Sequence, residues 1–176
     1  MMQSLKQFIS EGNELQQRIN KHIVRGESVG AISPEGSHTD TPEKLKAAHS
    51  QMKQDLEAAR KAGKIGGWSG PHKGQYQYGG HNEVAHESSY VVHAAGHEQE
   101  HHDNMVKALS EIGNKHKQES VLSVDRNKKA QWHYLNKSDK PGTASDQGKL
   151  AYNRPLARNT GRTQLKGSSQ SFTSVK

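Results

Sequence analysis

The periodic spacing of apolar residues ends at Asn136, and this limits how much of the chain can fold around one core. Only 30% of the 176 residues are hydrophobic and 5% are aromatic. Beyond Asn136, small polar residues dominate, and such a segment cannot bury enough apolar surface to offset the entropy lost on ordering. We therefore predict one small folded domain followed by a disordered tail over residues 137–176.

Positive charge is concentrated in that tail. Residues 137–176 contain eight Lys or Arg and two Asp, a net charge of +6, whereas residues 1–136 contain 17 basic and 16 acidic residues, a net charge of +1. Basic side chains spaced along an extended chain bind phosphate backbones by releasing counterions, without reading the base sequence. The candidates for non-specific contact with DNA are Lys149, Arg154, Arg158, Arg162 and Lys166.

The composition also excludes several classes of protein. There is no cysteine, so neither a disulfide framework nor thiolate chemistry is available. No apolar run approaches the roughly 20 residues that a membrane-spanning helix needs. The N-terminus has no apolar stretch of the secretory kind. We expect no membrane partner.

The order of predicted elements indicates an α+β domain. The clearest helix begins at Asp40 or Thr41, either of which can cap it, with Pro42 at the first helical position, and it ends at Gly63. A second helix is predicted from Asp103. Strands are predicted over residues 28–33, 65–78, 87–93, 121–124 and 130–135. This β-α-β-β-α-β order, with one extra strand, predicts a ferredoxin-like sandwich over residues 23–136, preceded by a helical leader over residues 1–22.

The N-terminus carries a first family resemblance. Residues 2–12 form a short amphipathic segment that ends in Ile9-Ser10-Glu11-Gly12. This pattern resembles the capsid-targeting leader of internal head proteins in T-even-like phages, which ends in an aliphatic residue, any residue, then Glu before a small residue. The resemblance implies cleavage between Glu11 and Gly12, contact with the phage capsid or scaffold, and packaging in the head. An ordinary surface helix is the alternative.

The middle of the chain carries a second resemblance, over residues 27–136. Glu87 opens a predicted strand, a helix follows, and Gln118-Glu119 opens the next strand. This plan resembles a small phage and bacterial domain, and it is similar in layout to the phage S-adenosylmethionine lyases. The resemblance implies that Glu87 lies near a bound substrate and that Gln118 and Glu119 form a structural turn. It also implies a homo-oligomer, because the lyase sites form between subunits of a trimer.

A histidine-rich segment suggests a metal site. His97-Glu98-Gln99-Glu100-His101 fits the H-E-x-x-H pattern, in which two imidazoles bind zinc and the Glu activates the bound water. Glu119 is the nearest candidate for a third ligand. However, the segment has almost no apolar residue to pack on a core. This favours a polar loop that leads into the second helix.

Together these patterns predict a phage accessory protein. Its location would be the capsid interior and then the host cytoplasm, its partners would be phage DNA and capsid, and it would need no cofactor. The alternatives are an S-adenosylmethionine lyase-like enzyme acting through Glu87 and a zinc hydrolase acting through His97, Glu98 and His101. A third class is an inhibitor of host enzymes, for which the sequence identifies no target.

Overall fold

One antiparallel sheet with three helices forms the fold, which confirms the predicted α+β class. The computed structural model describes residues 6–9, 14–78, 84–153 and 171–175. The strands are β1 (Lys6–Ile9), β2 (Val29–Ile32), β3 (Gly67–Tyr78), β4 (Val84–His93), β5 (Ser120–Val124), β6 (Lys129–Tyr134), β7 (Ala144–Asn153) and β8 (Ser171–Val175). The helices are α1 (Glu14–Val24), α2 (Pro42–Lys61) and α3 (Gln99–Lys115). In space the strands follow the order β1-β3-β4-β2-β5-β6-β7-β8.

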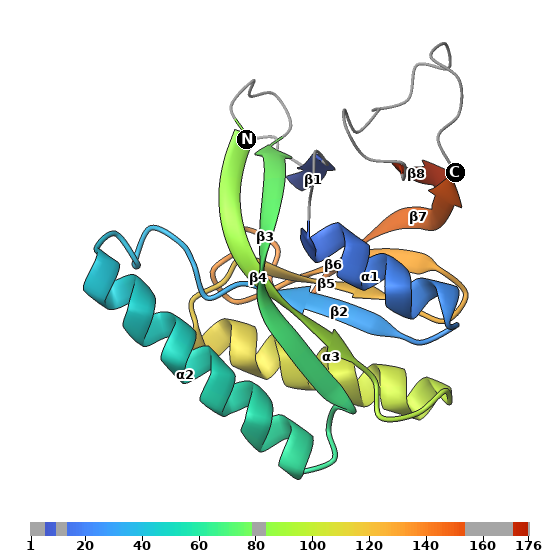
Figure 1. Ribbon diagram of the computed structural model, residues 1–176, viewed down its shortest axis with the longest axis horizontal. Helices are drawn as coiled ribbons and strands as arrows, with labels where there is room; N and C mark the ends of the chain where they lie inside the picture. The colour runs from blue at the N-terminus through green and yellow to red at the C-terminus, as the bar shows by residue number, and fades with distance from the viewer. Residues whose placement is uncertain (1–5, 10–13, 79–83, 154–170, 176) are drawn as a thin grey trace.

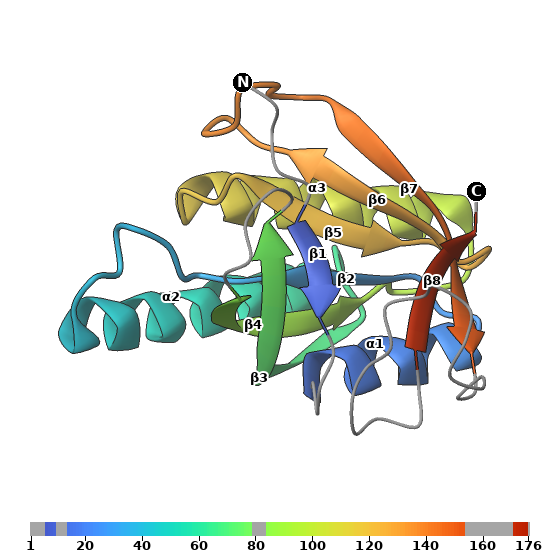
Figure 2. The same cartoon turned by 90° about the horizontal axis from the view of Figure 1, so that it is seen from above.

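The helices cover both faces of the sheet (Figure 1). Helices α2 and α3 lie side by side on one face, and α1 lies on the other. Turning the molecule shows that the sheet curves, so that its outer strands β1 and β8 lie on the side of α1 (Figure 2). In the described part of the chain, no helix has the length and apolar character needed to cross a membrane.

Two apolar clusters correspond to these two faces. The first joins α2 and α3 to the sheet and comprises Ile32, Met52, Leu56, Ala59, Ile65, Tyr90, Val92, Ala94, Met105, Ala108, Leu109, Ile112, Val121 and Leu135. The second lies under α1 and comprises Leu15, Ile19, Ile23, Val29, Ala31, Val91, Leu122, Val124, Ala130 and Trp132. Because successive side chains of a strand point to opposite faces, central strands such as β4 contribute to both clusters.

The two long helices begin differently. In α2, the Thr41 hydroxyl accepts a hydrogen bond from the Lys44 backbone N–H (3.3 Å), and Pro42 occupies the first turn, as predicted. Helix α3 begins at Gln99, four residues before the predicted start, with Glu98 in the N-cap position and no side-chain cap bond. The predicted helix is confirmed, but its predicted start was wrong because its first turn is polar and carries no apolar periodicity.

Close packing requires a glycine in the middle of β2. A β-carbon at Gly30 would collide with the Leu109 side chain and would lie 3.1 Å from the Leu122 carbonyl oxygen. The absence of a side chain therefore lets α3 approach the centre of the sheet.

The prediction of a helical leader is correct only in part. Glu14–Val24 is helical, but Lys6–Ile9 forms β1, which pairs with β3 (Phe8 opposite Tyr76). Helical spacing of Leu5, Phe8 and Ile9 was misleading because a short apolar run fits a strand equally well. Leu15 and Ile19 are buried against the sheet, so α1 packs as part of the folded core.

The predicted disorder after Asn136 is wrong for residues 144–153 and 171–175. Strand β7 pairs with β6, and β8 pairs with β7. Pro141 and Gly142 lie in the β6–β7 turn, where the Gly142 N–H donates to the Tyr134 carbonyl and Gly142 has a positive φ of 77°. The polar composition suggested disorder, but a strand that pairs its backbone with an open sheet edge needs few apolar side chains.

Candidate functional site

Glu87 lies in the part of β4 that extends beyond β2. Its strand pairs with β3, where Gly74 is the partner of Glu87, and β2 pairs only with Tyr90–His93. Since Val91 packs under α1, the two-residue period places Glu87 and Ser89 on that same face, opposite α2 and α3. Glu87 is half-buried and faces a glycine across the strand pair, so no side chain stands directly opposite it.

His72 is a neighbour of this position on β3. It pairs with Ser89, is buried, and its Nε2 lies 2.9 Å from the Ser69 hydroxyl. Burial lowers the pKa of His72, and the nearby Arg18 lowers it further, while Glu14 opposes both. The first turns of α1 therefore contribute charge to the same face of the sheet as Glu87.

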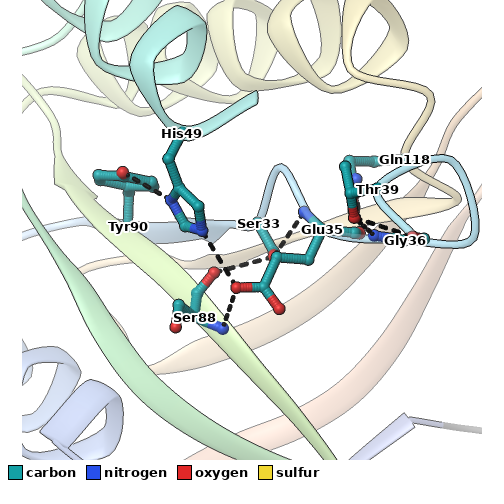
Figure 3. Close-up of polar contacts among 8 residues, drawn as sticks. All are labelled: Ser33, Glu35, Gly36, Thr39, His49, Ser88, Tyr90 and Gln118. Atoms are coloured by element: carbon teal, nitrogen blue, oxygen red, sulfur yellow. Dashed lines mark hydrogen bonds and ion pairs between the residues drawn. The ribbon is translucent and has the colours of Figure 1, made fainter. Parts of the chain in front are cut away.

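Beyond the end of β2, the side chains of Ser33 and Glu35 hydrogen-bond to the backbone of Ser88 (Figure 3). The Ser33 hydroxyl donates to the Ser88 carbonyl (2.9 Å), and the Ser88 N–H donates to Glu35 Oε1 (3.0 Å). Strand β2 ends at Ile32, just before Pro34, which lacks an N–H to continue the ladder. The chain thus keeps the backbone of β4 hydrogen-bonded where sheet pairing stops.

A hydrogen-bonded chain of side chains continues from Glu35 into the core. His49 Nε2 lies 3.1 Å from Glu35 Oε1, and His49 Nδ1 lies 2.9 Å from the Tyr90 hydroxyl. Because a carboxylate only accepts, His49 donates from Nε2 to Glu35, and a neutral imidazole then accepts at Nδ1 from the Tyr90 hydroxyl. Tyr90 is 0% exposed, and burial, followed by the charge of Glu35, raises its pKa to about 12.

The backbone of Glu35 is also fixed. Its N–H donates to the Ser33 hydroxyl (3.1 Å), and its carbonyl accepts from Gln118 Nε2 (3.0 Å). Gln118 is buried and also donates to the His116 carbonyl (3.3 Å). The residue pair expected to form a turn before β5 is therefore connected, through Gln118, to the loop beside Glu87.

The residues of the zinc hypothesis lie at the start of α3 and before β5. Glu98 Oε2 lies 3.3 Å from His101 Nε2. His97 precedes the helix, and its carbonyl accepts from Arg126 (3.3 Å). Glu119 is exposed, and its carbonyl accepts from the Leu135 N–H (2.8 Å). Within the described ranges no three His, Asp or Glu side chains gather as a metal site, and the zinc set stays a prediction.

A different pair of histidines lines a hollow of about 410 Å³ between α3 and β6. His102 is 7% exposed, and its Nδ1 has no hydrogen-bond partner among the described residues. His133 Nε2 lies 2.7 Å from the Ser123 hydroxyl. Burial lowers the pKa of both imidazoles and so favours their neutral forms. Their sequence positions, 31 residues apart, gave no signal of this pairing.

The other predicted site residues fall mostly outside the described residues. Glu11 and Gly12, the predicted processing site, do so, and so do Arg154, Arg158, Arg162 and Lys166 of the predicted DNA-binding set. Lys149 lies in β7, opposite Lys129 of β6 and Val175 of β8.

Comparison with known families gives a match over most of the chain. The S-adenosylmethionine lyase family matches residues 36–173, which run from the loop before α2 through most of β8. A comparison with curated proteins gives no match. The family match spans far more than half of the 176 residues and includes Glu87, His49 and Gln118, whereas Ser33 and Glu35 precede it. The chain therefore belongs to the S-adenosylmethionine lyase family.

Proposed function

We propose that the protein cleaves S-adenosylmethionine by the lyase reaction. The family match over residues 36–173 carries this proposal. In the reaction, a carboxylate oxygen of the substrate attacks the γ carbon of its own methionine part, and the bond from that carbon to the sulfonium sulfur breaks. The electron pair of the broken bond stays on sulfur. The products are homoserine lactone and 5′-methylthioadenosine.

This chemistry places modest demands on protein side chains. No proton is transferred and no external nucleophile enters, so neither a general acid nor a general base is required. The positive sulfonium and the negative carboxylate of the substrate neutralise each other as the lactone forms. The protein must fold the substrate so that the carboxylate oxygen approaches the γ carbon opposite sulfur, and it must hold the substrate in that geometry.

Glu87 is our candidate for holding the sulfonium. A carboxylate within a few ångströms of a cation attracts it strongly where water is partly excluded. Glu87 is half-buried, and its partner across the strand pair is Gly74, which supports access of a ligand to this stretch of the sheet. By the family layout we further propose that the site is completed by a second copy of the chain in a homo-oligomer. The central strand order β3-β4-β2-β5 supports the ferredoxin-like arrangement as part of this proposal.

The test is turnover by the full-length protein. Purified protein incubated with S-adenosylmethionine should release methylthioadenosine and homoserine lactone in equal amounts. Glu87→Gln should lower kcat/KM by about 100-fold, the scale of losing one charge-assisted contact of 2–3 kcal/mol. The matched control is Glu111→Gln, an exposed carboxylate on α3 that pairs with Lys64 (3.3 Å) and should leave turnover unchanged. Absence of both products from the wild-type protein would overturn the proposal.

The leader and the basic tail add a second proposal about location. We infer packaging in a phage head from the Ile9-Ser10-Glu11-Gly12 pattern, and non-specific contact with DNA from the tail charge of +6. Protein recovered from purified particles should begin at Gly12. Protein that begins at Met1 or Met2 in particles would contradict leader cleavage.

A further inference from the structure

The peptide group that follows Glu87 is held by a carboxylate from another part of the chain. The Ser88 N–H belongs to the peptide unit that joins Glu87 to Ser88, and it donates to Glu35 Oε1 (3.0 Å). The orientation of that peptide plane restrains the ψ angle of Glu87 and, with it, how the Cα–Cβ bond of Glu87 is directed from the strand. On the opposite edge of the strand, Glu87 itself pairs with Gly74.

Strand pairing alone does not supply this restraint. The last residue of β2 that pairs with β4 is Ile32, opposite Tyr90. Beyond it, Ser33 and Glu35 both hydrogen-bond to Ser88 on this side of β4. Edge backbone that is held less has greater freedom, so these two side chains contribute to the rigidity of β4 next to Glu87.

Glu35 can act as a fixed support because several groups hold it. Its N–H, carbonyl and carboxylate contact Ser33, Gln118 and His49 respectively. The side chains of Glu35 and His49 are each 17% exposed, and His49 is anchored in turn to Tyr90, which is 0% exposed. A carboxylate held in this way presents its oxygen to Ser88 with little further loss of side-chain entropy.

We propose that Glu35 is a positioning residue, which orients the Glu87 carboxylate toward the positive sulfonium of the substrate. This inference rests on the proposed function. Glu35 contacts the Ser88 backbone and His49 of α2 (Figure 3). The two-residue period of β4 places Glu87 on the opposite face of the sheet, with Val91 under α1. Glu35 therefore acts through the backbone of β4 and does not touch the substrate.

The measured quantity is the preference of the protein for a positively charged ligand over a neutral one. S-adenosylhomocysteine lacks the methyl group and the positive charge. The ratio of its Kd to that of S-adenosylmethionine therefore reports how strongly Glu87 attracts the sulfonium. We expect Glu87→Gln to abolish this preference in the full-length protein. Glu35→Ala should reduce it about tenfold, and Glu35→Gln, whose amide oxygen still accepts from Ser88, should restore most of it.

A second carboxylate–imidazole pair, between Asp55 of α2 and His116 at the end of α3, provides the matched control. Asp55 Oδ2 lies 2.8 Å from His116 Nε2, and the side chains of this pair are 14% and 6% exposed. Asp55→Ala should lower the free energy of unfolding about as much as Glu35→Ala does, but it should leave the Kd ratio unchanged. In the absence of ligand, hydrogen exchange of the Ser88 amide should accelerate in Glu35→Ala and not in Asp55→Ala.

The outcomes separate the two proposals. If Glu87→Gln loses the preference and Glu35→Ala keeps it, the positioning role is wrong while the proposed function stands. If Glu87→Gln keeps the preference, the assignment of Glu87 to the sulfonium fails, and the role of Glu35 fails with it. If Glu35→Ala lowers the preference further in a Glu87→Gln background, the two residues act independently, which also contradicts positioning.

Discussion

Tyr90 connects the apolar core to the polar cluster beside Glu87. Its ring packs edge-on against Trp68, with ring centroids 5.8 Å apart, and its hydroxyl bonds to His49. A buried hydroxyl without a partner would cost about 1–3 kcal/mol, which explains why a helix residue of α2 reaches toward β4 at this point. The cluster therefore depends on core packing as much as on its own hydrogen bonds.

The raised pKa of Tyr90 predicts a loss of stability at high pH. Burial raises this pKa to about 12, whereas an unfolded tyrosine titrates near 10. The folded protein favours the neutral phenol, so the contribution is complete below about pH 10 and is lost as the pH rises from about 10 to 12. Urea unfolding at pH 9 and pH 11 should show this loss in the wild type and a smaller one in Tyr90→Phe. An equal loss of unfolding free energy in the wild type and in Tyr90→Phe would contradict this prediction. Tyr134→Phe serves as the control.

Only some residues of the candidate site could be predicted from the sequence. A family resemblance placed Glu87 on a strand, and the structure has it in β4. Glu35 and His49 were missed because their partners lie 53 and 41 residues away, at Ser88 and Tyr90. A local signal was Pro34, which prevents β2 from continuing its pairing with β4 beyond Tyr90.

At the scale of elements, α1 is the clearest example of a segment that belongs to the core. Leu15, Ile19 and Ile23 are 0%, 2% and 4% exposed and pack on β2, β4, β5 and β6. Their spacing of four residues forms one stripe on the helix. Sequence patterns identified α1 and α2 by such stripes but missed β1, β7 and β8, which are outer strands with little apolar periodicity.

Truncation of the α1 stripe should destabilise the whole domain. We expect Leu15→Ala to lower the free energy of unfolding by about 2–4 kcal/mol, because it leaves a cavity between α1 and the sheet. Gln17→Ala, on the exposed side of the same helix, should change it by less than about 0.5 kcal/mol. Equal urea midpoints for Leu15→Ala and the wild type would contradict the placement of α1 in the core.

At the scale of the whole molecule, the family match and the charge distribution overlap in the C-terminal region. The match extends to residue 173, so it includes strands β7 and β8 and the basic residues between them. The region therefore contributes to the fold, and the DNA contact proposed for its basic side chains is an additional role.

Neutralising basic residues tests that additional role without removing a strand. Changing Arg154, Arg158, Arg162 and Lys166 to Gln should weaken binding to duplex DNA at low salt. The slope of log K against log salt should fall by about 3 to 4, because each lost phosphate contact removes about 0.9. Changing four exposed lysines elsewhere, Lys46, Lys53, Lys61 and Lys107, controls for net charge. Equal salt slopes for the two variants would contradict a specific role of the tail.

The most direct test of the lyase proposal is the origin of the oxygen on the γ carbon of the product. Full-length protein would be incubated with S-adenosylmethionine in water labelled with ¹⁸O, and the products analysed promptly by mass spectrometry. Intramolecular attack predicts methylthioadenosine together with homoserine lactone whose γ oxygen is unlabelled, since that oxygen comes from the substrate carboxylate. Homoserine carrying ¹⁸O on its γ carbon, or no methylthioadenosine, would contradict the proposed reaction.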